Sequence, residues 1–204
     1  MNTALLSPSG DRASAALTEL RYLLGVDGGG TGTRVRLADR SGTVLGQGEA
    51  GPSALGQGSE QAWRHIQQAV RAAAESAGLA RIDLAHCAIG LGLSGASVPA
   101  QAQSFLAQQP GYTVLALDGD GWTTVLGAHG GRPGAVVAAG TGSVGEALRA
   151  DGSRVCISGW GWVSGDEGSG AWLGLKAIRH TQAVLDGRAA GGPLSAAVGR
   201  IVGA

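Results

Sequence analysis

Hydrophobic and polar positions near the start of the chain predict three short strands and a helix. Apolar residues form a run over 21–26, and they alternate with polar residues over 33–40 and 43–50, which is the period of a half-buried strand. A glycine-rich turn and a Ser-Gly turn separate these stretches. Over 59–77 the apolar spacing becomes helical, and we expect Trp63 in the core. The pattern predicts three antiparallel strands before one long helix.

The next part of the chain alternates strand and helix signals. Strands are predicted at 84–91 and 112–117, and helices at 99–109 and directly after Asp120. Such alternation is typical of a parallel βαβ arrangement. The first half of the chain is therefore predicted to be α/β.

A second set of signals begins at Gly134. Strands are predicted at 134–139, 144–150 and 154–158, followed by a glycine-rich loop, a helix over 171–185 and a helix start at Pro193. No strand signal follows. The expected organisation is a flexible N-terminal extension over 1–20, a first domain over 21–133 and a second domain over 134–204.

Composition narrows the class of protein. The chain has 204 residues, of which 44% are hydrophobic and 15% charged, which is enough apolar surface to form a core. Fifteen basic residues balance fifteen acidic ones, so neither a nucleic acid nor a membrane surface is an expected partner. No signal-peptide or membrane-spanning pattern is seen. Cys87 and Cys156 are too few for a disulfide framework, and we expect them to be buried thiols of a cytoplasmic protein.

Two turns combine glycine with hydroxyl residues. They are Gly28–Thr33 and Gly140–Ser143, and each lies between two predicted strands. Backbone N–H groups in such turns can bind a phosphate, glycine lets it approach, and hydroxyls add donors. Asp27, just before the first turn, could hold a hydrated Mg²⁺. For one turn alone a tight hairpin is the better explanation, whereas two matching turns favour phosphate binding. For Asp27 the weaker alternative is a residue that caps the turn.

Two other nucleotide-binding motifs fit the sequence less well than two phosphate-binding turns. A Walker A loop has the pattern G-x-x-x-x-G-K-[ST]. It is excluded because the sequence has a single lysine, Lys176, and this lysine does not stand in such a pattern. Gly90–Gly95 has the G-x-G-x-x-G spacing of a dinucleotide-binding turn, with Asp118 ending the next predicted strand. That alternative begins after three antiparallel strands and leaves both glycine-hydroxyl turns without a role, so it is the weaker one.

Three motifs in order resemble a known family. Gly25–Thr33 (GVDGGGTGT), Gly140–Ser143 (GTGS) and Gly159–Ser169 (GWGWVSGDEGS) are similar to motifs of the BadF/BadG/BcrA/BcrD-type ATPases and of the N-acetylglucosamine and glucosamine kinases grouped with them. These belong to the actin, Hsp70 and hexokinase superfamily, and the resemblance covers roughly 22–185. It implies an α/β fold of two ribonuclease-H-like domains with ATP and sugar in the cleft between them. A complete first domain and only the start of the second are expected here.

The resemblance also implies an activity and its participants. The expected reaction is ATP-dependent phosphorylation of an amino sugar, of the glucosamine or N-acetylglucosamine type, at its primary hydroxyl. ATP and Mg²⁺ are the expected cofactors, a small sugar is the expected substrate, and a homodimer is a further expectation.

Matching motif positions gives the implied site residues. The nucleotide site would comprise Asp27, Gly28, Gly29, Gly30, Thr31, Gly32, Thr33, Gly140, Thr141, Gly142 and Ser143, with Asp27 also the metal ligand. The sugar site would comprise Ser94, Gly159, Trp160, Gly161, Asp166 and Glu167.

The catalytic base is implied to be Asp120. In the family an Asp precedes a Gly-Ala pair by seven and eight residues, and Gly127 and Ala128 place that Asp at 120. Phosphoryl transfer needs mainly positioning, Mg²⁺ and a carboxylate that accepts the proton of the attacking hydroxyl. Asp118 remains an alternative base, and a plain turn remains an alternative for both residues.

Two departures from the family pattern leave other functions open. Ala54 stands where the family has a sugar-contacting Asn, and Gly191-Gly192 comes too early for the family's adenosine-binding glycine pair. A truncated, non-catalytic protein that binds sugar or nucleotide is therefore one alternative. Another is an ATPase activator of the 2-hydroxyacyl-CoA dehydratase type, whose dimer holds an iron–sulfur cluster, with Cys87 and Cys156 as the available cysteines.

Overall fold

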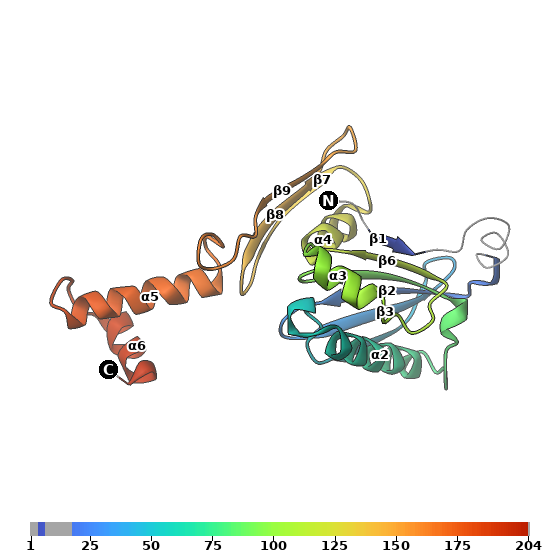
Figure 1. Cartoon of the computed structure of the whole chain (residues 1–204), viewed down its shortest axis with the longest axis horizontal. Coiled ribbons are helices and arrows are strands. Elements are labelled where there is room, and N and C mark those ends of the chain that lie inside the picture. The colour runs from blue at the N-terminus through green and yellow to red at the C-terminus, as the bar shows by residue number, and fades with distance from the viewer. Residues whose placement is uncertain (1–3, 7–17, 204) are drawn as a thin grey trace. The chain divides into compact units, whose positions relative to one another are not determined.

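The computed structural model describes residues 4–6 and 18–203, and the chain forms two compact units. The first is Met1–Gly127 and the second is Ala128–Ala204 (Figure 1). Each unit has its own sheet, and each is described by itself.

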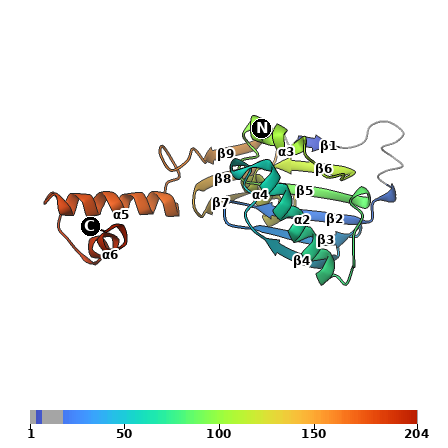
Figure 2. The same ribbon diagram turned by 60° about the horizontal axis from the view of Figure 1, so that its bottom comes forward.

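The first unit is built on a six-stranded sheet. Its strands are β1 (Ala4–Leu6), β2 (Tyr22–Gly28), β3 (Thr33–Asp39), β4 (Val44–Ala50), β5 (Cys87–Leu93) and β6 (Val114–Asp118), in the order β1-β6-β5-β2-β3-β4 (Figure 2). Strands β2, β3 and β4 pair antiparallel, while β5 and β6 run parallel to β2. This is the sheet of an actin-like first domain, and it confirms the predicted α/β class.

Strand β1 was not predicted. Ala4–Leu6 pair antiparallel with β6, at the edge of the sheet. Part of the segment 1–20, expected to be a flexible extension, therefore belongs to the sheet. For residues 1–3 and 7–17 that expectation concerns positions outside the described part of the chain.

Helices α2 and α3 and two short 3₁₀ turns accompany the sheet in the first unit. Helix α2 (Ser59–Ser76) packs on β3 and β4, and α3 (Pro99–Leu106) contacts α2. The turns are η1 (Leu55–Gln57) and η2 (Leu84–His86). The second turn corrects the predicted strand 84–91, because the Asp83 carboxylate accepts a hydrogen bond from the Ala85 N–H and holds a turn there.

An aromatic cluster lies in the core between α2 and α3. Trp63 is 6% exposed, and its ring stacks on Phe105 with a centroid separation of 4.2 Å. The indole Nε1 donates to the Phe105 carbonyl oxygen at 2.9 Å, and Tyr112 stacks more loosely against the same indole. The expectation that Trp63 is a core residue is confirmed.

Helix α2 lies directly on the backbone of β4. A Cβ added at Gly48 would lie 2.1 Å from the Ala69 carbonyl oxygen, whereas one added at Gly25 in β2 would meet no atom within 4 Å. The close approach of helix to strand at position 48 therefore requires glycine.

Gly48→Ala is expected to lower the free energy of unfolding by about 1–3 kcal/mol, since the contact is with backbone that cannot rotate away. The matched variant Gly25→Ala should change it by no more than about 0.5 kcal/mol. Urea unfolding of both variants measures the difference, and equal midpoints would contradict the close packing of α2 on β4.

Helix α4 (Asp120–His129) begins in the first unit and ends in the second. The second unit continues with an antiparallel sheet of β7 (Gly134–Ala139), β8 (Ser143–Leu148) and β9 (Arg154–Ser158), in that order. Helices α5 (Gly170–Leu185) and α6 (Pro193–Val202) follow and pack on each other. The predicted pair of hairpins and the two helices are confirmed.

The second unit exposes several large apolar side chains. Val137 in β7 is 84% exposed, and Ile157 in β9 is 67% exposed. Cys156, also in β9, is exposed, so the expectation of two buried thiols is wrong for this cysteine and right for Cys87. Side chains alternate between the faces of a strand, and this three-stranded sheet leaves part of both faces uncovered.

Candidate active site

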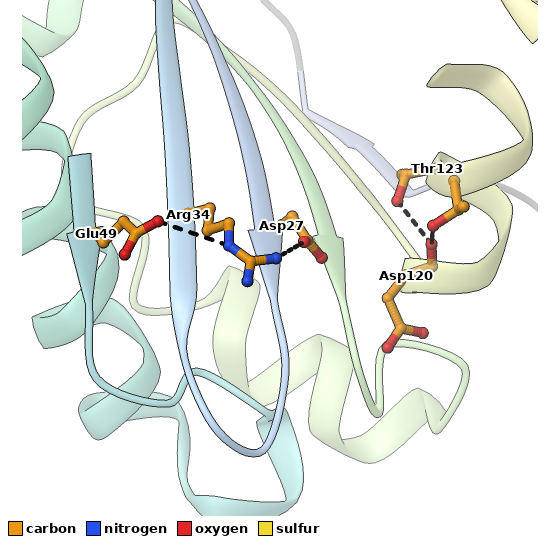
Figure 3. Close-up of polar contacts among 6 residues, drawn as sticks. Asp27, Arg34, Glu49, Asp120 and Thr123 are labelled. Carbon is orange, nitrogen blue, oxygen red and sulfur yellow. Dashed lines mark hydrogen bonds and ion pairs between the residues drawn. The ribbon is translucent and has the colours of Figure 1, made fainter. Parts of the chain in front are cut away.

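The carboxyl ends of the central parallel strands carry the acidic residues predicted for the site. Asp27 is the sixth residue of β2, Asp118 ends β6, and Asp120 begins α4. Because β6 and β2 run in the same direction, these residues lie at one edge of the first unit's sheet. Figure 3 shows Asp27 and Asp120 at this edge.

Asp27 has a basic neighbour that sequence reasoning missed. Arg34 Nη1 lies 3.7 Å from Asp27 Oδ2, and Arg34 Nε lies 3.7 Å from Glu49 Oε1 (Figure 3). Strand register places the three side by side, since Asp27 pairs with Arg34 and Arg34 pairs with Glu49. All three side chains are largely exposed, so these ion pairs contribute little stability. They place the Arg34 guanidinium beside Asp27, the carboxylate that is predicted to hold Mg²⁺.

The Asp120 carboxyl is half-buried at the start of α4. Burial raises its pKa, and the negative charge of Asp27 raises it further, while a hydrogen bond from the Gly121 N–H to Oδ1 acts in the opposite direction. The hydroxyls of Thr123 and Thr124 donate to the Asp120 carbonyl oxygen and hold the first turn of the helix (Figure 3). A carboxylate with a raised pKa is a better proton acceptor, which suits a general base.

Asp120→Asn is expected to raise the free energy of unfolding at pH 7. A carboxyl whose folded pKa exceeds its unfolded pKa costs stability at higher pH, because the unfolded state releases its proton more readily. The gain should be full above the raised pKa and should vanish as the pH falls below the usual value of about 3.9. Urea unfolding between pH 3 and pH 8 measures it.

Asp39→Asn is the matched control in the same unit. The Ser41 hydroxyl and the N–H groups of Ser41 and Thr43 donate to Asp39, which lowers its pKa. Its ionised form therefore stabilises the fold above the unfolded pKa, and the Asn variant should lose stability at pH 7. Changes of the same sign in both variants would contradict the assignment for Asp120.

The first glycine-hydroxyl turn presents backbone donors. The Gly29 N–H donates to the Gly32 carbonyl oxygen at 3.0 Å and closes the turn. Within the described residues, no acceptor is bonded to the N–H groups of Gly30, Thr31 and Gly32. Gly30 and Thr31 are exposed, so a phosphate oxygen could reach these donors.

Gly28 and Thr33, at the two ends of this turn, face the protein interior. Thr33 is 1% exposed, and its hydroxyl lies 2.6 Å from the Gly51 carbonyl oxygen and 2.7 Å from Ser53 Oγ. A Cβ at Gly28 would lie 2.1 Å from the same Ser53 Oγ. The Thr33 hydroxyl is thus already bonded within the protein, and the role of Thr33 in the nucleotide site stays a prediction.

Ser94, predicted for the sugar site, lies beside the first turn. Its N–H donates to the Gly28 carbonyl oxygen at 3.0 Å, and its own carbonyl accepts from the Leu55 N–H at 2.9 Å. Ala54, the position that departs from the family pattern, donates its N–H to the Gly29 carbonyl oxygen. The structure thus joins the first turn, Ser94 and the segment around Ala54.

The dinucleotide-binding alternative is wrong. Gly90 and Gly92 lie inside strand β5 and are paired on both sides with β2 and β6, so they do not form a turn between a strand and a helix. A Cβ at Gly92 would lie 2.0 Å from Thr123 Oγ1, which explains why glycine is needed there.

The second glycine-hydroxyl turn has a similar build in the other unit. The Gly140 N–H donates to the Gly142 carbonyl oxygen at 2.9 Å, and Thr141 is exposed. Ser143 is 9% exposed, and its hydroxyl donates to the Glu167 carbonyl oxygen at 3.0 Å. As with Thr33, the Ser143 hydroxyl is bonded inside the protein, and the role of Ser143 in the nucleotide site stays a prediction.

The predicted sugar residues of the second unit lie on one loop next to that turn. Asp166 is 7% exposed and has a φ of 59°, and its Oδ2 would lie 2.8 Å from a Cβ at Gly142. Glu167 is exposed, and its Oε2 accepts from the Ser158 hydroxyl at 3.3 Å. Trp160 is 80% exposed. Gly159 and Gly161, with φ values of 75° and 85°, allow the loop its shape.

Residues 24–204 match the BadF/BadG/BcrA/BcrD ATPase family. The chain belongs to this family. It is 34% identical over 168 residues to the glucosamine kinase GspK of Vibrio cholerae, which aligns 82% of this chain with 57% of that protein. It is 29% identical over 174 residues to the N-acetylmuramic acid/N-acetylglucosamine kinase of Clostridium acetobutylicum, covering 83% of this chain and 56% of that one.

The chain is also similar to a solved structure that is named as a kinase of an amino sugar. It is a protein of Chromobacterium violaceum named as a putative N-acetylglucosamine kinase, with a TM-score of 0.87 and 53% identity, covering 91% of this chain and 65% of that one. The chain therefore spans about three fifths of the length of these family members. Among the described residues, no helix has both the length and the apolar character required to cross a membrane.

Proposed function

We propose that the protein containing this chain transfers a phosphoryl group from ATP to the primary hydroxyl of an amino sugar of the glucosamine or N-acetylglucosamine type. The observation that carries the proposal is the edge of the first unit's sheet, where Asp120, with its raised pKa, lies near Asp27 and the turn with unbonded N–H groups. Membership of the family and similarity to two amino-sugar kinases support the same activity.

Asp120 is the proposed base, and Asp27 is the proposed ligand of a hydrated Mg²⁺. When bound, Mg-ATP supplies the transferred phosphoryl group and neutralises part of its charge. The exposed Asp27 carboxylate fits a cation that keeps most of its water. The half-buried Asp120 accepts the proton of the sugar hydroxyl as that oxygen attacks the phosphorus.

The phosphate-binding groups are proposed to be backbone donors and the exposed hydroxyls. In the first turn these are the N–H groups of Gly30, Thr31 and Gly32 and the Thr31 hydroxyl; in the second turn, Thr141 is the corresponding exposed residue. Such donors stabilise phosphate charge without a lysine.

Each unit, taken by itself, carries residues that are proposed to contact the sugar. Ser94 is the contribution of the first unit, and the loop of the second unit contributes the residues predicted from the family motif, namely Gly159, Trp160, Gly161, Asp166 and Glu167. The exposed indole of Trp160 offers an apolar face with a polar N–H, which suits a sugar ring. We also propose that the two units correspond to a first domain and the beginning of a second.

ADP formation by the full-length gene product, with glucosamine and N-acetylglucosamine as acceptors, tests the function. We expect sugar-dependent ADP release that requires Mg²⁺. Saturable sugar binding without ADP release would favour the non-catalytic alternative instead. Iron in the purified protein would favour the dehydratase activator, although Cys87 is buried and burial raises its pKa to about 11.

A further inference from the structure

The two glycine-hydroxyl turns share a feature that their sequences alone do not reveal. In each, the first hydroxyl residue is exposed, namely Thr31 or Thr141, and the last is buried, namely Thr33 or Ser143. The buried hydroxyl bonds to a neighbouring segment of the same unit. We call Thr33 and Ser143 the anchor hydroxyls.

The bonding of Thr33 follows from its single hydroxyl proton. The Thr33 hydroxyl donates to the Gly51 carbonyl oxygen at 2.6 Å and to Ser53 Oγ at 2.7 Å. Its one proton is therefore shared between two acceptors. Thr33 is thereby fixed to two residues of the segment 51–54, and both Thr33 and Ser53 are buried.

The segment 51–54 is tied to the turn a second time through its backbone. The N–H groups of Ser53 and Ala54 both donate to the Gly29 carbonyl oxygen, at 3.0 and 3.1 Å. The His65 ring contacts the Pro52 carbonyl oxygen at 2.6 Å and holds the segment on α2. One buried hydroxyl pair and two backbone bonds therefore set where the first turn lies.

Ser143 forms the corresponding link in the second unit. Its hydroxyl donates to the Glu167 carbonyl oxygen, and its own carbonyl accepts from the Gly159 N–H at 3.0 Å. The Gly170 N–H donates to the Gly140 carbonyl oxygen at 2.8 Å. The second turn is thus fixed to both ends of the loop that carries Asp166.

We propose that Thr33, Ser53 and Ser143 are positioning residues that fix each phosphate-binding turn to the segment on the sugar side of the same unit. This inference rests on the proposed kinase function. The anchor hydroxyls make no contact with ATP; they set the place of the exposed donors around Thr31 and Thr141. Their loss displaces those donors, and a small displacement weakens both nucleotide binding and transfer.

Kinetics of the full-length gene product test the inference with Thr33→Val, Ser53→Ala and Ser143→Ala. We expect each to raise KM for ATP about tenfold and to lower kcat by a similar factor. Thr33→Ser, which keeps the hydroxyl, should retain the KM of the wild type. Ser53→Ala removes the other hydroxyl of the Thr33–Ser53 pair. It therefore tests the same link if Thr33→Val does not fold.

Thr181→Val is the matched control. Thr181 is 4% exposed, and its hydroxyl donates to the Ala177 carbonyl oxygen within α5, so the bond involves neither turn. Loss of stability alone reduces the amount of active enzyme and leaves KM unchanged, as expected for Thr181→Val. An unchanged KM for ATP in all three anchor variants would overturn the inference.

Hydrogen exchange separates this inference from the kinase proposal. In the 204-residue chain, the hydrogen-bonded amides of Gly29, Ser53 and Ala54 should exchange several-fold faster in Thr33→Val than in Thr33→Ser. Equal exchange would overturn the positioning role even if the wild type proves inactive. Faster exchange in a protein that forms no ADP would support the positioning role and contradict only the proposed function.

Discussion

Replacing Asp120 by Asn is expected to lower kcat by about 10²–10⁴-fold in the full-length gene product, which is the usual contribution of a general base. The amide cannot accept the proton of the attacking hydroxyl, while its size and its bond from the Gly121 N–H allow it to keep the native position. KM for ATP should change little, because Asp120 is not among the proposed nucleotide ligands. Steady-state ADP release measures both constants.

Asp118→Asn is the control that the chain itself provides. Asp118 ends β6 only two residues before Asp120, and its Oδ1 accepts from the Gly119 N–H at 2.7 Å. We expect a kcat within about tenfold of the wild type, since this carboxylate serves the turn into α4. A larger loss in Asp118→Asn than in Asp120→Asn would transfer the role of base to Asp118.

Trp63→Ala should produce the largest loss of stability, about 3–5 kcal/mol, because it removes a buried indole and leaves a cavity beside Phe105. The Phe105 carbonyl oxygen also loses its bond from Nε1. Urea unfolding of the 204-residue chain measures the effect, followed by the fluorescence of the remaining tryptophans.

Two variants separate the parts of that effect. Trp63→Phe keeps an aromatic ring next to Phe105 and loses the hydrogen bond, so a smaller loss is expected. Trp160→Ala removes an indole that is 80% exposed, and unfolding should change by no more than about 0.5 kcal/mol. A loss in Trp160→Ala as large as that in Trp63→Ala would show that burial does not determine the cost.

Much of the fold follows from the periodicity of the sequence. The alternation over 33–40 and the helical spacing over 59–77 gave strand β3 and helix α2 within two residues at each end. Ala4–Leu6 were missed because three residues are too few to show a period. The first residues of the predicted strand 84–91 form a turn, because the Asp83 side chain accepts a hydrogen bond from the Ala85 N–H. The pattern of apolar residues carries no sign of this side-chain bond.

The candidate site was predicted in part. The sequence placed Asp27 and the glycine turns at strand ends and Asp120 just after one, because strand ends are visible as breaks in the apolar pattern. It did not identify the burial of Thr33, although Thr33 has the same parity as Val35 and Leu37 and must share their inward face. The pairing of Arg34 with Asp27 depends on the register between β2 and β3. That register cannot be predicted from the sequence of either strand alone.

The two cysteines can report separately on the two units. Cys87 is fully buried in the core of the first unit, and Cys156 is exposed on β9 of the second. Burial raises the pKa of both thiols, so both are alkylated faster at higher pH. A maleimide reagent should then label Cys156 in the native chain and reach Cys87 only when the first unit opens. The rate of the second labelling event therefore measures how often that sheet opens.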